Sequence, residues 1–473
     1  MRPAKSKTVG RIVGLLALFL VAGCAVGPDF KQPVVMTPES YRLDSMPTEA
    51  MVNLVWWELF NDPVLYTLVT AALENNQDVQ IAASRVEQAR AFVGFNRADQ
   101  FPRVDVEGGA GTGNFLGTRS PTTNNNFYLA PVLSWEIDFW GKFRRATDAA
   151  RAELMASGYG LKTVQLSLLS EVVSAYYRLL DFHQRLAVSQ STFKSRQKSL
   201  DIIQKRFDRG IVPELDVNQA QIELETAAAS IPLYERQIAK GENALSILLG
   251  KLPGAIDIGK DLKAQAMPPD IPVDLPSNLL TRRPDISEAM FLLKAQNEKI
   301  GVAEAQRFPA ISLTGLVGVA SSNVASVVSD GGIWSVGGGL LGPLIDFKKN
   351  IQRVQIEEQR TRQALYRYEK TVLTAFREVD DSLAEIETFK KQFVAVGKKR
   401  KAAKNANKLS KERYDKGVSS YLEVLDTERS LFSAELELSE VKQLYLNAYV
   451  GLYKALGGGW LTKAQMDGSS KKP

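Results

Sequence analysis

Cysteine and histidine are nearly missing from this chain of 473 residues. It has one cysteine, Cys24, and one histidine, His183. A single cysteine excludes a disulfide within the chain, and a lone histidine without a cysteine partner argues against a zinc site. No serine, cysteine or lysine lies in a recognisable nucleophile motif. We therefore expect a protein that is not an enzyme and that uses no metal and no dissociable cofactor.

Long hydrophobic runs are missing after Cys24. No stretch there reaches roughly 18 consecutive apolar residues, the length at which a transmembrane helix becomes a candidate. If the mature chain crosses a membrane, it has to do so as β-strands, because only helices and closed barrels satisfy their backbone polar groups in lipid.

A strong excess of one charge is missing as well. The formal net charge is +6, but the first 23 residues hold four basic groups and no acid, so the rest of the chain carries +2. No nucleic-acid partner is expected from this balance. The basic run GKKRKAAKNANK, residues 397–408, is interpreted as the solvated face of a helix. The glycine-rich stretch GGAGTGNFLG, residues 108–117, lacks the GK[ST] ending of a phosphate-binding loop and is interpreted as strand and loop.

The first segment predicts export. A basic region (Arg2, Lys5, Lys7 and Arg11) precedes an apolar run from Ile12 to Leu20, which is typical of a secretory signal peptide. Val21-Ala22-Gly23 before Cys24 resembles a bacterial lipobox, in which the cysteine becomes residue one and carries diacylglyceryl and N-acyl (palmitate) chains. Ala25 in place of aspartate resembles the outer-membrane address of such lipoproteins. The alternative is a chance cysteine at the end of an ordinary signal.

The chain contains one long unit twice. Asp78, Gly94, Phe101-Pro102, Gly210 and Leu249-Gly250 each recur 207 residues later, as do Arg206, Leu215 and Val217. The Ile137-Asp138-Phe139 motif recurs after 208 residues, a difference of one residue in a loop. Each half is therefore expected to be a structural copy of the other.

Each copy has the same expected order of elements. A helix (near 63–98 and 285–306) leads to a Phe-Pro break, two strands, a very long helix, a glycine turn and a second long helix. The first very long helix is expected to run from Lys142 to Arg209, about 100 Å at 1.5 Å per residue. After the turns, apolar residues continue at alternating spacings of three and four over about four heptads, missing only at Gly241 and Thr427, which predicts a coiled-coil seam. The seam positions are Val217, Ala220, Leu224, Ala227, Ile231, Tyr234, Ile238, Leu245 and Leu248 in the first copy, and Val424, Leu431, Ala434, Leu438, Val441, Tyr445, Ala448, Leu452 and Ala455 in the second.

The domain organisation follows from this repeat. We expect a signal peptide at 1–23, a lipid-anchored N-terminal and equatorial segment at 24–62, a first repeat at 63–250, an equatorial linker at 251–284, a second repeat at 285–457, and a C-terminal tail at 458–473. Within the repeats, strands are expected at about 101–139 and 308–346, and tip turns at about 210–213 and 417–420.

The strand segments alternate between apolar and polar residues. One face of the second segment carries Phe127, Leu129, Leu133, Trp135, Ile137 and Phe139, and the other carries Tyr128, Ala130, Ser134, Glu136 and Asp138. Segments of about ten residues with this alternation suit the wall of a transmembrane β-barrel, although an ordinary half-buried sheet shows it too. The export signal and the lack of another core for these strands favour the barrel.

Four strands are too few to close a barrel, since about eight are the minimum. An open sheet in lipid would leave its edges unsatisfied, so several chains have to share one barrel. Two copies give eight strands and a filled interior, whereas three give twelve and room for a lumen. The number of strands per chain does not decide between a dimer and a trimer.

The lipobox, the start CAVGPDFKQP, the doubled unit, RYDKGVSSYLEVLD and the late LYKALGGGW together resemble the TolC/OprM-like outer membrane factor family. The resemblance is to its NodT-like lipoprotein members in RND-type multidrug efflux systems, and it covers essentially the whole mature chain. It implies a mixed α and β fold, in which a homotrimer forms a twelve-stranded barrel continued by a long α-helical coiled-coil tunnel across the periplasm. It also implies passive passage of small molecules, with a periplasmic adaptor and an inner-membrane RND-type pump as partners.

The resemblance assigns roles to the two turns. The tips that contact the adaptor would be Gly210, Ile211 and Val212 in the first copy and Gly417, Val418 and Ser419 in the second. The periplasmic gate would be formed by the acids Glu423 and Asp426, with Arg429 as a possible partner one turn on. Ser419 stands where some members have an arginine, and Glu423 where some relatives have aspartate.

Two other functions remain compatible with the sequence. One is an outer-membrane duct of a type I protein secretion system, with the same fold. The other is a lipid-anchored coiled-coil scaffold without a pore, which would have no use for the amphipathic strands.

Overall fold

The structure is a computed structural model, and it describes residues 25–38, 41, 62–113, 124–268, 276–326, 328–329 and 332–458. Cys24, the signal peptide and the C-terminal tail after residue 458 lie outside the described residues. The chain divides into two compact units. Unit 1 contains Met1–Val35, Ser84–Tyr159 and Glu288–Lys370, and unit 2 contains Met36–Ala83, Gly160–Ser287 and Thr371–Pro473. Each unit therefore draws on both sequence repeats.

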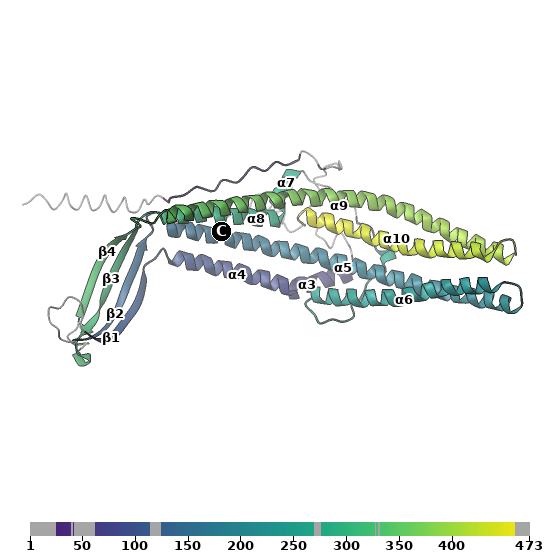
Figure 1. Ribbon diagram of the computed structural model, residues 1–473, viewed down its shortest axis with the longest axis horizontal. Coiled ribbons are helices and arrows are strands. Elements are labelled where there is room, and N and C mark those ends of the chain that lie inside the picture. The colour runs from purple at the N-terminus through teal and green to yellow at the C-terminus, as the bar shows by residue number, and fades with distance from the viewer. Residues whose placement is uncertain are drawn as a thin grey trace, which may run out of the picture. The chain divides into compact units, whose positions relative to one another are not determined.

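Unit 1 contains a four-stranded antiparallel sheet in the order β1-β2-β3-β4 (Figure 1). The strands are β1 (Arg103–Gly113), β2 (Asn124–Ile137), β3 (Ala310–Ser321) and β4 (Gly332–Leu341). All four lie within the two segments expected from the sequence. The register places Val104 opposite Leu133, Trp135 opposite Leu313 and Val317 opposite Trp334. Most large apolar residues of the four strands therefore share one face, as the alternation predicted, while Val132, Leu316, Ile333 and Leu341 lie on the other.

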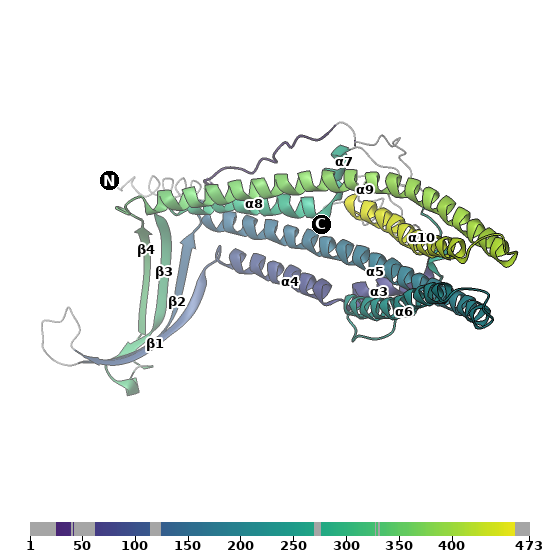
Figure 2. The same cartoon turned by 45° about the vertical axis from the view of Figure 1, so that its right-hand side comes forward.

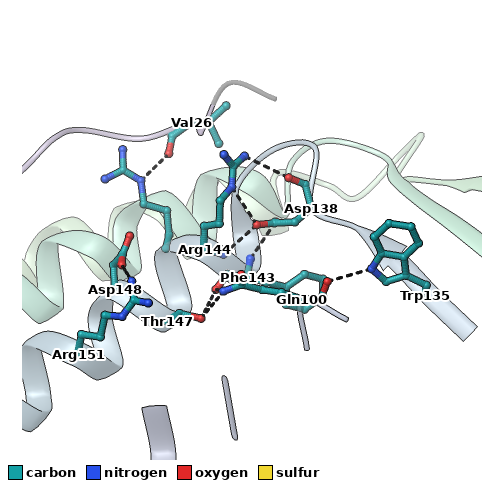
Figure 3. Close-up of polar contacts among 10 residues, drawn as sticks. Val26, Gln100, Trp135, Asp138, Phe143, Arg144, Thr147, Asp148 and Arg151 are labelled. Atoms are coloured by element: carbon teal, nitrogen blue, oxygen red, sulfur yellow. Dashed lines mark hydrogen bonds and ion pairs between the residues drawn. The ribbon is translucent and has the colours of Figure 1, made fainter. Parts of the chain in front are cut away.

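Helices follow the strands through a repeated capping motif. Asp138 comes one residue after β2 and accepts hydrogen bonds from the backbone amides of Phe143 (2.9 Å) and Arg144 (2.8 Å) at the start of α5 (Lys142–Asp208) (Figure 3). Asp346 does the same for α9 (Lys349–Asp415), where its carboxylate accepts from the amide of Asn350 at 3.1 Å. The free amides of a helix start need such acceptors. This need gives the repeated Ile-Asp-Phe motif a structural reason.

Polar contacts hold the end of α4 (Gln77–Ala98) to β2 and α5. The indole of Trp135 donates to the carbonyl of Gln100 at 3.0 Å, and the Gln100 amide donates to Thr147 Oγ1 at 2.7 Å (Figure 3). Strand and helix ends of the first repeat are thereby joined.

The N-terminal strap, residues 25–29, lies against the same helix start. The Val26 amide donates to the Trp140 carbonyl at 3.1 Å, and the Arg145 guanidinium donates to the carbonyls of Val26 (3.3 Å) and Gly27 (3.2 Å). Arg145 is itself buried beside Glu298 of α8 (Pro284–Ala305), at 2.7 Å. Gly27 adopts φ +100°, and a Cβ on it would come within 2.4 Å of the Gly301 Cα. The residues that follow Cys24 are therefore held in one place.

Unit 2 is helical. It contains α3 (Pro63–Asn75), α6 (Glu214–Leu248), α7 (Pro276–Arg282), α10 (Tyr421–Ala455), the 3-10 helix η1 (Leu262–Ala264) and the second parts of α5 and α9 (Figure 1). Its core is formed by buried side chains of α3, α5, α6 and α10, among them Leu65, Val172, Tyr176, Leu245 and Leu446. None of the eighteen predicted seam residues is exposed, which confirms the seam.

One expected helix is interrupted. The sequence pattern predicted a continuous helix near 63–98, but α3 ends before Asn76, whose backbone is extended at ψ 132°. The Asn76 side chain then accepts hydrogen bonds from the amides of Asp78 (2.9 Å) and Val79 (3.3 Å) and donates to the carbonyl of Leu248 at 3.0 Å. An asparagine that caps a new helix and holds the end of α6 breaks the run. Among the described residues, no helix combines the length and the apolar character needed to cross a membrane.

Candidate functional site

Two hairpin tips have the same backbone. Gly210 follows α5 with φ +73°, and Gly417 follows α9 with φ +71°. The amide of Ile211 donates to the carbonyl of Arg206 (2.9 Å) and that of Gly210 to Phe207 (2.7 Å), and the same pair of bonds links Val418 to Arg413 and Gly417 to Tyr414. This is the Schellman ending of a helix, in which the residue with positive φ is usually glycine. The doubled sequence phrase is therefore a doubled turn.

The two hairpins pack together at the tips (Figures 1 and 2). A buried cluster joins Ile203 of α5, Ala220 of α6, and Tyr421, Val424 and Leu425 of α10. The rings of Tyr414 and Tyr421 lie 5.3 Å apart, and the Arg206 guanidinium lies over the Tyr414 ring at 4.7 Å. We call these residues the tip cluster. The cluster brings both tips to the same end of unit 2.

Apolar side chains project from both tips at equivalent positions. Ile211 and Leu215 are 65% and 62% exposed, and their counterparts Val418 and Leu422 are 62% and 55% exposed. Val212 instead packs partly buried against the tip cluster. The two glycines are exposed, whereas Ser419 is half-buried. An exposed apolar pair on each tip is a feature that a partner protein can cover.

The three residues expected at the gate make separate contacts within the chain. Glu423 pairs with Arg413 of α9 at 3.1 Å. Asp426 is exposed and makes no hydrogen bond or ion pair with any described residue. Arg429 pairs with neither acid, although the sequence made that pairing possible, because its guanidinium is bound to Glu223 of α6.

Glu223 and Arg196 form a buried ion pair that the sequence analysis missed. Their side chains are 5% and 2% exposed, with 2.9 Å between Arg196 Nη2 and Glu223 Oε2. Arg196 of α5 also lies over the Phe432 ring of α10 at 5.1 Å. Burial lowers the pKa of Arg196 from its ordinary value, while Glu223 acts in the opposite direction. Together with Arg429, these residues form an arginine–glutamate–arginine triad across three helices.

His183 and the glycine-rich stretch, which the sequence analysis also considered, lie in regular secondary structure where the structure describes them. His183 lies half-buried in α5, and burial lowers the pKa of its imidazole. No group of histidine, cysteine and acidic side chains that could hold a metal occurs in the described part of the chain. Residues 108–113 of the glycine-rich stretch belong to β1, and the rest of it lies outside the described residues.

Comparisons with known proteins agree with this geometry. The family model described as outer membrane efflux protein matches residues 68–251 and again residues 275–458. The toluene efflux pump outer membrane protein TtgI of Pseudomonas putida is 35% identical over 459 residues, covering 94% of this chain and 97% of the relative. The probable outer membrane lipoprotein SilC of Salmonella typhimurium is 29% identical over 458 residues, covering 95% and 99%.

A solved structure has the same fold. The outer-membrane channel OprN superimposes with a TM-score of 0.86 at 29% identity, covering 92% of this chain and 100% of that chain. The match thus extends over the sheet and the long helices alike. The family resemblance drawn from the sequence is confirmed: the chain belongs to the outer membrane efflux protein family and serves as a channel for efflux at the outer membrane.

Proposed function

We propose that three copies of this chain form one passive exit duct, with a twelve-stranded barrel in the outer membrane and a helical tunnel in the periplasm. The observation that carries the proposal is the open sheet. In the order β1-β2-β3-β4, the strands β1 and β4 each have a neighbour on one side only. In lipid such edges have to be paired, and pairing β1 of one copy with β4 of the next closes the wall.

The sheet has the surface that lipid requires. On its apolar face, Val106 is 71% exposed, Trp334 78%, Val336 81% and Leu340 72%. The other face is mostly polar and carries Arg103, Asp105, Ser312 and Thr314 beside a few apolar residues such as Val132 and Leu316. An exposed apolar band backed by a polar face is the pattern of a barrel wall with a wet interior. This surface, together with the names of the relatives, favours an efflux duct over protein secretion or a scaffold without a pore.

The partners follow from the duct. A passive channel needs an energy source elsewhere, which we assign to an inner-membrane RND-type pump linked through a periplasmic adaptor. The apolar pairs Ile211 with Leu215 and Val418 with Leu422 are the surface that the adaptor would cover. The cargo is assigned to small molecules chosen by the pump, in line with the toluene named in the relative TtgI.

Of the three residues expected at the gate, Asp426 is the best candidate, because the other two are already paired within the chain. Because Glu423 is held by Arg413 and Arg429 by Glu223, Asp426 alone of the three keeps an unpaired charge. Three copies would place three such carboxylates at one mouth, where they attract cations and repel anions. The simpler alternative is that Asp426 only complements the dipole of α10, which is worth about 0.3 to 1 kcal/mol.

Single-channel recording of the Asp426→Asn variant in planar bilayers tests the gate. We expect weaker cation selectivity and weaker block by multivalent cations than in the wild type, because the ring of charges is removed. Asp201→Asn, an exposed acid on α5, is the matched control and should leave both quantities unchanged. A small drop in melting temperature with unaltered selectivity would leave only the dipole role. A wild-type protein without any conductance would contradict the duct itself.

Cys24 is the proposed attachment site of the membrane lipid. It lies outside the described residues, but the strap that follows it is fixed by Trp140 and Arg145 beside the end of β2. The relative SilC is named a lipoprotein, which supports the assignment.

A further inference from the structure

The basic run of α9 has two sides. Cations on one side pair with acids of α10, as Lys399 with Glu437 (2.7 Å) and Arg400 with Glu435 (3.2 Å), and Lys411, just after the run, pairs with Glu428 (2.6 Å). These pairs connect the two helices of the second hairpin, and their charges are already neutralised within the chain. They account for only part of the run.

The other side is a lysine stripe, formed by Lys398, Lys401, Lys404 and Lys408. Spacings of three, three and four residues place the four side chains on one side of a helix. All four are exposed, and the first three make no ion pair or hydrogen bond with any described residue. Lys408 approaches only Glu412, at 3.9 Å. At 1.5 Å per residue, the stripe lies about 14 to 29 Å from the tip glycine Gly417.

The first hairpin lacks this stripe. The residues 207 positions earlier on α5 are Ser191, Lys194, Gln197 and Asp201, with one cation and one anion among them. Gln197 moreover donates a hydrogen bond to Asp201 at 3.2 Å. Lys198 and Lys205 of α5 and Arg209 just after it are also exposed, but the acids Asp201 and Asp208 lie among them, so the α5 flank is mixed in charge whereas the α9 stripe is basic. The apolar pairs at the tips are alike in the two hairpins, and this difference in charge along the flank distinguishes them.

We propose that the lysine stripe is a docking surface for an acidic helical face of the periplasmic adaptor, and that it directs the adaptor to the second hairpin rather than the first. The inference rests on the proposed function, in which the tips contact an adaptor. A helix that covers the apolar tip and continues along α9 reaches the stripe, and acids at spacings of three and four meet its lysines. Charge complementarity of this kind fixes orientation and raises the association rate more than the final affinity.

Photo-crosslinking in cells locates the partner. A photoreactive residue is placed at Val418 on the tip, at Lys401 in the stripe, or at Lys194, the α5 counterpart of Lys401. We expect the same adaptor to be captured from Val418 and Lys401, and far less of it from Lys194. No adaptor from Val418 would overturn the proposed function. An adaptor from Val418 but not from Lys401, or capture of a second copy of this chain from Lys401, would overturn the stripe alone.

Association kinetics test the charge directly. The adaptor identified from Val418 is purified, and its binding to the full-length assembly is measured for the wild type, for the triple variant K398Q/K401Q/K404Q and for K194Q. At about 50 mM salt we expect the association rate of the triple variant to fall roughly tenfold, and the difference to disappear near 0.5 M, where exposed charges are screened.

K194Q should bind like the wild type, and an unchanged melting temperature of the triple variant shows that folding is intact. Equal association rates of wild type and triple variant at low salt would refute the docking role of the stripe.

Discussion

Glu223 is shared by two guanidinium groups at the base of the tip cluster. Arg196 reaches it from α5 and Arg429 from α10, so one carboxylate links the two hairpins. With two cations and one anion in contact, the acid is the member whose loss leaves the most charge unbalanced. Removing one partner of a buried ion pair is costly because the other charge stays buried without compensation.

The variant Glu223→Gln should therefore destabilise the tip. Arg196 is 2% exposed and cannot turn to water without disturbing its contact with Phe432. We expect a loss of about 3 kcal/mol in the free energy of local opening. Hydrogen exchange of α6 and α10 near the tip measures this loss, and resting conductance should rise with it.

The exposed neighbour Glu225→Gln is the control for this change. The double variant Glu223→Gln with Arg196→Met should recover part of the loss, because a hydrophobic side chain replaces the uncompensated charge. Equal protection of the amides in Glu223→Gln and the wild type would show that the triad does not hold the hairpins together.

Sequence reasoning was weakest at this scale. Arg429 follows Asp426 by three residues, so local spacing made it a partner for the acids, but its observed partner lies 206 residues away. Such a contact depends on how α6 packs on α10, which a helical pattern does not reveal. The available signal was an acid directly before the seam residue Leu224, at the border of the buried stripe.

At the scale of elements, much of the fold could be predicted. The expected helix from Lys142 to Arg209 is observed as α5 from Lys142 to Asp208, because the capping Asp138 and the turn glycine mark its ends. The strands and their faces followed from alternation. The break at Asn76 has a local signal, an asparagine that caps α4, but its second support, a hydrogen bond to Leu248 in another helix, could not be predicted.

The tip turns support a prediction about docking. Gly417 has positive φ, and a Cβ added there meets no atom within 4 Å. Gly417→Ala should thus cost about 1 kcal/mol through backbone strain alone. Gly417→Trp carries the same strain and adds a large side chain where the adaptor would sit.

We expect the tryptophan variant to lose efflux and adaptor crosslinking while the alanine variant keeps both. Minimum inhibitory concentrations and crosslinking yield are the measurements, with melting temperature as the test of folding. If both variants crosslink like the wild type, the tips are turns with no role in docking.

At the scale of the whole molecule, the two repeats explain why one chain has an open sheet that cannot close a barrel by itself. Each repeat supplies two strands to the sheet and one hairpin to the tip, which yields four strands and two hairpins. The number of copies could not be deduced from strand arithmetic, because eight and twelve strands both close a barrel. It entered through the family resemblance.

The membrane anchor gives a prediction for the intact protein. Mass spectrometry of the mature N-terminus should find Cys24 as residue one with diacylglyceryl and N-acyl chains. Cys24→Ser should abolish this mass shift while leaving the helical circular dichroism in place. An unmodified Cys24 in the wild-type outer-membrane protein would remove the lipid assignment.

Crosslinking of the sheet edges tests the central claim, that three copies close one wall. Each double variant carries one cysteine in place of Val106 in β1 and a second cysteine at one position of β4 between Trp334 and Leu340. Disulfides are then formed by mild oxidation in membranes. Cys24 is the only native cysteine, and its sulfur carries the lipid in the proposed anchor, so new disulfides report the added pairs alone. At one register we expect a ladder of one, two and three chains that ends at three. A ladder that ends at two chains, or the absence of crosslinks at every register, would contradict the account.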